Sequence, residues 1–290
     1  MKHVNLKWEL MNLCSRNRDG SFATQAARKD ILALCVKQLK AAGFRYLSVE
    51  SLKPKHVQAL ISKWQEEGKS TGTIKNRTAH LRWWAEKIGK PNIMARDNST
   101  YGIPKRKFVT NKSKAIELDK DKLDKISDEW IKCSLELQRA FGLRKEESIK
   151  FRPKYADLGD RIRLRASWTK GGKAREILIR NSYQRETLIK AHRIAVSGSL
   201  IPAYKKYVQQ KDLFERLCKG VGFSKTHGLR HAYAQERYKE LTGRDCPACG
   251  GKTSKELTIE EKALDLKARL QISLELGHNR EEVSAIYLGR

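Results

Sequence analysis

Five side chains between residues 144 and 287 are of types that could break a phosphodiester bond without a metal ion. Arg144 follows a Gly-Leu pair, His227 lies three residues before Arg230, and His278 follows Leu-Gly nine residues before Tyr287. A tyrosine hydroxyl can act as a nucleophile. Arginine binds phosphate oxygens through a planar fork that stays charged. In this order, the five residues suggest transesterification of a nucleic acid at a tyrosine.

The charge of the chain favours a polyanionic partner. Its 290 residues include 61 lysines and arginines against 33 acidic residues, a formal net charge of +28. The basic residues are spread along the whole chain, which favours nucleic acid gripped by folded surfaces over a basic tail. No apolar run approaches the ~20 residues of a membrane span, and the first residues lack the apolar core of a signal peptide. We therefore expect no membrane partner and an intracellular location.

The first hundred residues show four helical patterns. Apolar residues recur at helical spacing near 5–17 and 24–41, Pro54 can open a third helix, and Ser70 or Thr71 can cap a fourth. The fourth helix has a basic, polar face that could contact DNA, although ordinary solvated residues would give the same pattern. This face comprises Lys75, Arg77, Thr78 and Arg82.

Proline and glycine interrupt the pattern after this helical region. We expect an extended basic linker over 93–118, which could lie along a phosphate backbone or serve as a solvated hinge. Its basic residues include Lys105, Arg106 and Lys107. The linker would join a helical domain at 1–92 to a second domain at 119–290.

The second domain changes its hydrophobic period near its centre. Residues 161–168 and 175–180 alternate on either side of a Gly-Gly turn, which predicts a β-hairpin. Helical patterns precede this hairpin and return after it at roughly 182–196, 203–219, 226–242 and 258–275. The expected fold is therefore mainly α with a small antiparallel β-sheet.

In order, spacing and setting, these runs resemble the tyrosine recombinases, the phage-integrase-like family of DNA strand-exchange enzymes. The resemblance implies a SAM-like helical domain that clamps core DNA and a mixed α/β catalytic domain. It implies that Arg144 and Arg230 hold the scissile phosphate. His227 would hydrogen-bond the phosphate or the tyrosine hydroxyl, His278 would donate to a non-bridging oxygen, and Tyr287 would be the nucleophile.

Further assignments follow from the same resemblance. Glu147 occupies the acidic position three residues after the first arginine and would orient it; a surface ion pair is the plainer explanation. Lys170 lies where the family carries a mobile lysine that acts as general acid. Lys173, three residues later, is the alternative, and we prefer Lys170 because it follows the first strand in a Thr-Lys-Gly arrangement. His231 is interpreted as a bystander that points elsewhere on its helix.

The implied reaction needs no ATP, metal or other cofactor. The tyrosine oxygen would attack the scissile phosphate, form a 3′-phosphotyrosyl bond and release a 5′-hydroxyl; a 5′-hydroxyl from another duplex would reverse the step. Exchange between two double-stranded DNA sites implies a homotetramer, with accessory DNA-bending proteins as possible partners. We expect an integrase of a mobile genetic element, encoded by a bacterium or phage and acting in the cytoplasm at the nucleoid.

One stretch departs from the family pattern. The interval between the two site histidines contains an apparent insertion over 242–257, with Cys246 and Cys249 in a Cys-x-x-Cys run. Zinc sites of this type need four ligands, and the sequence offers no second pair. We therefore interpret the insertion as a plain surface loop. The four remaining cysteines are scattered, which favours structural roles.

Two other functions fit parts of the pattern. A type IB topoisomerase would share the chemistry and would relax supercoils without sequence preference or oligomerisation. A catalytically silent DNA-binding regulator could share the fold, but it would not need the complete set of reactive residues. A covalent adduct on nicked DNA separates both enzymes from the regulator.

Overall fold

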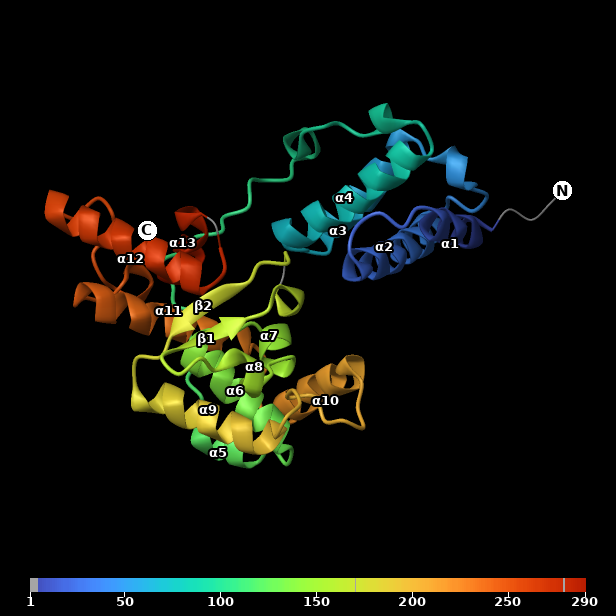
Figure 1. Cartoon of the computed structure of the whole chain (residues 1–290). Helices are drawn as coiled ribbons and strands as arrows, with labels where there is room; N and C mark the ends of the chain where they lie inside the picture. The colour runs from blue at the N-terminus through green and yellow to red at the C-terminus, as the bar shows by residue number, and fades with distance from the viewer. Residues whose placement is uncertain (1–4, 170, 279) are drawn as a thin grey trace. The chain divides into compact units, whose positions relative to one another are not determined.

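The computed structural model describes residues 5–169, 171–278 and 280–290 (Figure 1). The chain divides between Lys107 and Phe108 into two compact units, each with its own hydrophobic core. Both ends of the predicted linker pack against a unit. Met94 and Ile103 are buried in the first core, and the amide of Ile116 donates to the carbonyl of Gly228 in the second unit over 3.2 Å.

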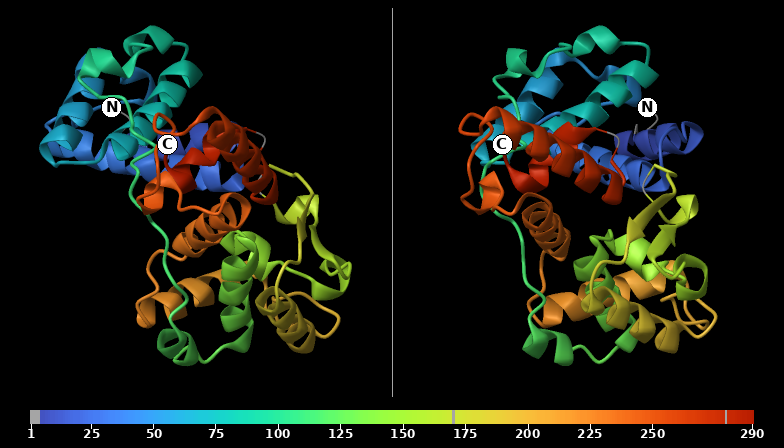
Figure 2. Two further views of the ribbon diagram at one scale, coloured as in Figure 1. Left: turned by 90° about the vertical axis from the view of Figure 1, so that its left-hand side faces the viewer. Right: turned by 60° about the vertical axis from the view of Figure 1, so that its left-hand side comes forward.

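The first unit is a group of four α-helices joined by short turns (Figure 2). They are α1 (Leu6–Arg16), α2 (Phe22–Ala41), α3 (Pro54–Glu66) and α4 (Thr71–Lys87). Pro54 opens α3 and the Ser70 side chain caps α4, as the sequence predicts. The apolar faces meet around Trp64 and Trp84, both fully buried, so each helix is held mainly by packing.

The second unit has α-helices on both sides of a β-hairpin in the chain. Before the hairpin come α5 (Lys120–Asp124), α6 (Glu129–Phe141), α7 (Lys145–Ile149) and α8 (Pro153–Ala156). After it come α9 (Ser182–Ala195), α10 (Tyr207–Gly220), α11 (His227–Thr242), α12 (Ile259–Glu275) and α13 (Ala285–Leu288). Helix α6 is central, because it packs against α7, α9 and α11. No helix of the described ranges is long and apolar enough to cross a membrane.

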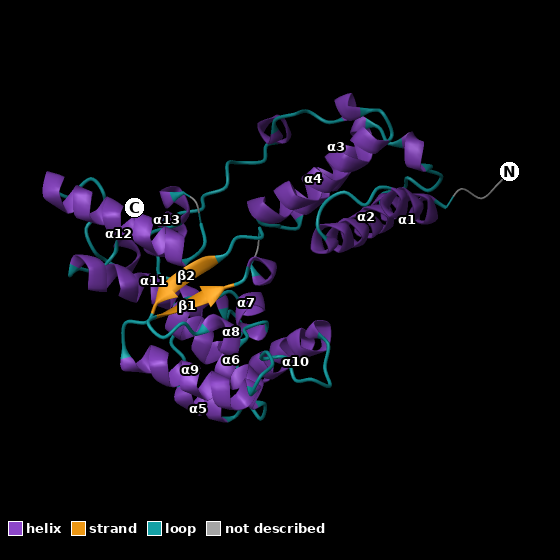
Figure 3. Ribbon diagram, viewed as in Figure 1, coloured by secondary structure: helices purple, strands orange, loops and turns teal. Residues whose placement is uncertain are grey.

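The hairpin consists of β1 (Arg161–Leu164) and β2 (Arg175–Leu178), which pair antiparallel (Figure 3). The first strand is shorter than predicted, because Ala166–Trp168 form a 3-10 turn instead. This turn lets Trp168 leave the strand direction and pack edge-on against Tyr155 and near Phe151. The expected class, mainly α with a small antiparallel sheet, is confirmed.

The insertion is part of the second core. Cys246, Pro247 and Ala248 are buried, and the short turn Pro247–Cys249 packs against α13. The interpretation of 242–257 as a plain surface loop is therefore wrong. The apolar residues at the centre of this polar stretch pack into the core. In the sequence, the surrounding glycines and charged residues obscure that apolar signal.

Candidate active site

The turn between α6 and α7 carries Arg144. Gly142 ends α6 in the left-handed region (φ 61°), and a Cβ there would lie 2.5 Å from the ring of Tyr233. Glycine is therefore required by both conformation and space. Leu143 is buried, and Arg144 then occupies the cap position of α7. Its backbone N–H donates to Oε2 of Glu147 over 2.8 Å, and its Nη1 donates to Oε1 over 2.7 Å.

Glu147 is a buried anion shared by two arginines. Its side chain has no solvent exposure, so a surface ion pair is excluded. Arg175, at the start of β2, donates to both of its carboxylate oxygens over 3.1 and 2.7 Å. Burial by itself raises the pKa of Glu147, but the hydrogen bonds and charge of Arg175, with the charge of Arg230, lower it to about 2. Arg175 is not among the site residues predicted from the sequence, because its alternating pattern is typical of a strand residue with its side chain in solvent.

The start of α11 carries His227 and Arg230. Thr226 is at the cap position of α11, and its side chain makes no capping hydrogen bond. Arg230 is completely buried, and burial lowers its pKa to about 10. Two of its nitrogens donate to backbone carbonyls, Nη1 to Gly142 and Nη2 to Leu276. This guanidinium is thereby locked between the ends of α6 and α12.

The guanidinium of Arg230 also lies beside Tyr287 and His278. Its Nε lies 3.2 Å from the hydroxyl of Tyr287, and its Nη2 lies 3.3 Å from Nε2 of His278. The same His278 nitrogen is 3.5 Å from the Tyr287 hydroxyl. The ring centre of His227 lies 5.9 Å from that of Tyr287. The hydroxyl of Tyr287, on α13, is thus flanked by Arg230 from α11 and by His278 from the turn after α12, with His227 near the ring. Arg144, at the start of α7, acts on Arg230 through its charge.

His231 also contacts the tyrosine. Its ring centre is 4.7 Å from that of Tyr287 and 5.6 Å from that of His227. The interpretation of His231 as pointing elsewhere is therefore wrong. His231 lies four residues after His227, so the two rings share one face of α11, and α13 packs against that helix.

Burial and neighbouring cations keep the site histidines neutral. Burial, followed by the charges of Arg230 and Arg144, lowers the pKa of His227 and brings that of His278 down to about 4; Arg175 contributes at His278 as well. Burial, His227, Lys114 and Arg230 lower the pKa of His231 to about 4. A neutral imidazole can accept a proton, so each ring can serve as base or as a neutral hydrogen-bond partner at pH 7.

The hairpin connection carries the two candidate lysines. Lys170 lies outside the described residues. Lys173 is exposed, and its backbone N–H donates to Oγ1 of Thr169 over 2.9 Å. The Thr169 hydroxyl lies 2.7 Å from the Lys173 carbonyl, so this threonine closes the connection from its first residue.

Part of the predicted DNA-contacting face of α4 is used inside the first unit. Thr78 is fully buried, and its assignment to the polar face is wrong. Arg82 donates to the carbonyl of Ala95 and to Oδ1 of Asn98, and the Arg77 guanidinium lies 5.2 Å from the ring centre of Trp64. Lys75 is half-buried. Arg82 therefore holds the segment after α4, and Arg77 packs against α3, contacts that composition alone does not reveal.

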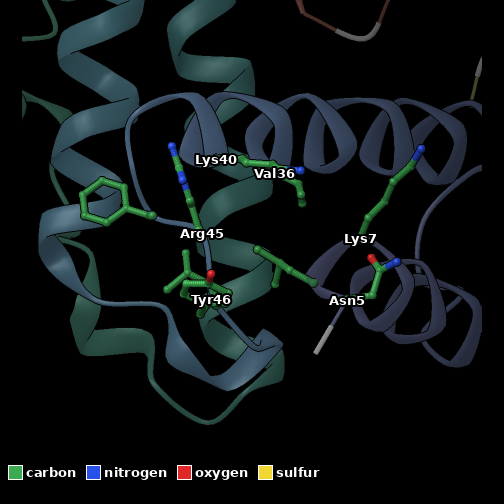
Figure 4. Close-up of a pocket in the computed structure, with 9 residues that line it drawn as sticks. Asn5, Lys7, Val36, Lys40, Arg45 and Tyr46 are labelled. Atoms are coloured by element: carbon green, nitrogen blue, oxygen red, sulfur yellow. The ribbon is translucent and has the colours of Figure 1, made fainter. Parts of the chain in front are cut away.

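Other basic side chains of the first unit are exposed. Lys105, Arg106 and Lys107 lie in a stretch without regular secondary structure. A recess of about 400 Å³ beside α1, the end of α2 and the following loop is bordered by exposed Lys7, Lys40 and Arg45 (Figure 4). The rim of this recess at Lys7, Lys40 and Arg45 offers positive charge at the surface of the first unit.

The cysteine pair forms a tight turn. The amide of Cys249 donates to the carbonyl of Cys246 over 2.8 Å, and the Cys249 thiol lies 3.1 Å from Oε1 of Gln235. Gln235 in turn donates to the carbonyl of Tyr287 over 3.0 Å. Within the described ranges no group of three or more histidine, cysteine or acidic side chains is arranged to hold a metal ion. The pair therefore helps to seat α13.

Comparison with known proteins places the chain in a family. The model described as "Phage integrase, N-terminal" matches residues 3–94, and the model described as "Integrase" matches residues 106–236. The chain belongs to the tyrosine recombinases, the phage-integrase-like site-specific recombinases. No curated protein matches the chain in sequence.

Solved structures share the fold over nearly the whole chain. The Tn1549 transposon integrase, in complex with circular intermediate DNA, is 13% identical with a TM-score of 0.55; the match covers 99% of this chain and 96% of that one. The lambda integrase tetramer bound to a Holliday junction is 17% identical with a TM-score of 0.62, covering 100% and 79%. XerH recombinase bound to palindromic difH substrate is 16% identical with a TM-score of 0.55, covering 97% and 80%.

Proposed function

We propose that this recombinase cuts and rejoins double-stranded DNA through a 3′-phosphotyrosyl bond to Tyr287. The observation that carries the proposal is the hydroxyl of Tyr287, held 3.2 Å from Nε of Arg230 and 3.5 Å from Nε2 of His278. The guanidinium of Arg230 can hydrogen-bond the attacking phenolic oxygen, and a neutral imidazole can receive its proton. These are the two conditions that a tyrosine nucleophile needs.

Arg144 and Arg230 would stabilise the charge on the phosphate. Arg144 is the more accessible of the two, with 19% of its side chain exposed. Arg230 is buried and already donates to two carbonyls, so its orientation is set before DNA arrives. Such preorganisation lets the donors act without rearranging during the reaction. His227 would hydrogen-bond the phosphate, His278 would donate to a non-bridging oxygen as the charge develops, and Lys170 would protonate the leaving 5′-oxygen.

Assembly would follow from the reaction. Strand exchange requires two duplexes and four cuts, and the lambda integrase structure is a tetramer on a Holliday junction. We therefore propose a homotetramer on paired DNA sites within a mobile genetic element. The exposed Lys105 and Lys107 and the rim of the recess at Lys7, Lys40 and Arg45 would contribute phosphate contacts. We also keep the expectation of a cytoplasmic protein of bacterial or phage origin, helped by DNA-bending proteins.

The test is adduct formation on a nicked suicide duplex that loses a short 5′-hydroxyl strand after cleavage. The wild-type chain should become covalently attached to DNA, and Tyr287→Phe should bind the same duplex and form no adduct. An adduct of undiminished yield with Tyr287→Phe would remove Tyr287 as the nucleophile. A library of half-sites from mobile-element ends supplies the substrate.

The same reaction in a chelator is the control for metal dependence. Charge stabilisation by Arg144 and Arg230, the hydrogen bond from His278 and the proton from Lys170 would serve the mechanism without a metal ion, so cleavage should persist. Loss that magnesium restores would overturn the mechanism. Loss that only zinc restores would make Cys246 and Cys249 structural metal ligands.

A further inference from the structure

Arg175 opens β2, and its side chain reaches two other elements of the second unit. Its Nη1 and Nη2 donate to the two carboxylate oxygens of Glu147, close to the start of α7. Its Nε donates over 2.8 Å to the carbonyl of Glu275, the last residue of α12. All three guanidinium nitrogens are used in this way, and the side chain is 6% exposed. Arg175 therefore joins the hairpin, α7 and α12 at one point.

One of these contacts sets the orientation of Arg144. Glu147 receives both the backbone N–H and Nη1 of Arg144. Because Arg175 grips both oxygens of the same carboxylate from the other side, the plane of that carboxylate is fixed. Arg144 is the more exposed of the two arginines that share Glu147. It faces the site in an orientation that this carboxylate fixes.

A second contact supports the turn that leads to His278. Gly277 has a φ of 67°, and a Cβ at this position would lie 2.9 Å from Nη1 of Arg175. The guanidinium thus packs directly against the turn after α12, in addition to holding the carbonyl of Glu275. His278 follows this turn, so its place depends on the same side chain.

We infer that Arg175 is a positioning residue that keeps the hairpin in register with Arg144 and His278. The inference rests on the proposed function. Arg144 would bind a phosphate oxygen and His278 would donate to a non-bridging oxygen, so both side chains act on the charge of the phosphate. Arg175 holds the carboxylate that orients Arg144 and the turn that leads to His278. A purely structural ion pair would have no such link to the chemical step.

The test compares two leaving groups in single-turnover cleavage. Lysine at position 175 keeps the charge but cannot bridge both carboxylate oxygens and a carbonyl. Arg175→Lys should bind DNA as the wild type does and should form the adduct roughly tenfold or more slowly on ordinary DNA. A duplex with sulfur in place of the bridging 5′-oxygen needs no proton on the leaving group. Because Arg144 and His278 act on the phosphate and not on the leaving oxygen, the loss of rate should persist on that duplex.

A double substitution separates positioning from general damage. If Arg175 acts through Arg144, then Arg144→Ala/Arg175→Lys should be little slower on ordinary DNA than Arg144→Ala alone. Arg161→Lys is the matched control, because Arg161 belongs to the same hairpin but pairs with exposed Asp160 and Glu176. It should cleave both duplexes at the wild-type rate.

Three results would overturn the inference: an unchanged rate for Arg175→Lys, recovery of the rate on the sulfur-substituted duplex, or additive losses in the double variant. If Arg175→Lys does not fold, Arg175→Gln with the same pair of duplexes gives the same decision. Absence of any adduct with the wild-type chain would instead reject the proposed function, and this inference with it.

Discussion

The two units employ buried arginines differently. In the first unit, Arg28 is paired with Asp19 over 3.2 Å, and Arg82 donates to the carbonyl of Ala95 over 3.0 Å. Each of these arginines ties one loop to one helix. Their contacts hold the helices and loops of that unit together.

In the second unit, arginines from three elements converge. Arg144 and Arg175 share Glu147, and the charge of Arg230 acts on the same carboxylate while its Nε faces Tyr287. Burial of an arginine is therefore no sign of function by itself. Convergence of several arginines on one anion and one phenol is the distinguishing feature, and substitutions in the two units should separate the two uses.

The largest contrast should come from replacing one arginine by lysine in each unit and comparing the two variants. Arg230→Lys removes the fixed donors to Tyr287 and to the carbonyls of Gly142 and Leu276. Loss of a preorganised donor should slow adduct formation roughly 10²–10³-fold. Arg82→Lys should reduce the free energy of unfolding by about 1 kcal/mol, the net value of a typical hydrogen bond, and leave the cleavage rate of folded protein unchanged.

Single-turnover cleavage and denaturant unfolding of both variants provide the measurement. Equal slowing by Arg82→Lys and Arg230→Lys would show that the convergence around Tyr287 has no special role.

A second contrast lies within the hairpin connection, between Lys170 and Lys173. A general acid protonates the leaving 5′-oxygen, so its removal should slow the chemical step by about 10²-fold or more without weakening binding. Lys170→Ala should therefore be slow on ordinary DNA and recover on the sulfur-substituted strand. Lys173→Ala should bind more weakly and be indifferent to the sulfur.

Recovery by Lys173→Ala instead would exchange the two assignments. If neither variant recovers, the proton comes from another group, and His227 is the next candidate.

Much of this architecture could be predicted because local rules decide it. Helical spacing, Pro54 and the cap at Ser70 define the first unit, and alternation around Gly-Gly predicts the hairpin. The reactive residues were found as a set because their order along the chain is distinctive. Single motifs such as His-x-x-Arg would not have sufficed.

The contacts that complete the site depend on tertiary packing. Arg175 looks like a strand residue with its side chain in solvent until β2 is laid against α7, and His231 faces Tyr287 only because α13 crosses α11. Similarly, Arg82 belongs to a basic stripe in sequence but bends back to Ala95. Helical or strand periodicity indicates which residues share a face of an element, but it does not indicate what that face packs against.

A third contrast concerns pH and the buried His231. In the folded chain the pKa of His231 is about 4, below the ordinary value of 6.5. Between these two pH values, the unfolded chain binds a proton at His231 and the folded chain does not. The stabilisation from keeping His231 neutral is therefore complete above pH 6.5 and is lost as pH falls towards 4. The difference should amount to a few kcal/mol at most, at about 1.4 kcal/mol per pKa unit.

His231→Phe keeps a ring against Tyr287 and removes the titration. Its free energy of unfolding should fall less steeply than that of the wild type between pH 6.5 and 4, as measured by denaturant unfolding at several pH values. Parallel curves would mean that His231 is protonated at little cost and that the charges of Arg230 and Lys114 do not act on it.

The smallest effect should distinguish exposed lysines from internally bonded arginines in the first unit. Each phosphate neutralised on duplex DNA contributes about −0.9 to the slope of log K against log salt. Lys105 and Lys107 are exposed, so Lys105→Gln/Lys107→Gln should make the slope shallower by up to roughly two such steps. Arg82 already donates to Ala95 and Asn98, so Arg82→Gln should weaken folding and leave the slope as it is. Binding titrations from low to moderate salt measure both. A slope that changes with Arg82 and not with the lysines would place the DNA backbone along α4, and it would show that an arginine bonded within its own domain can still neutralise a phosphate.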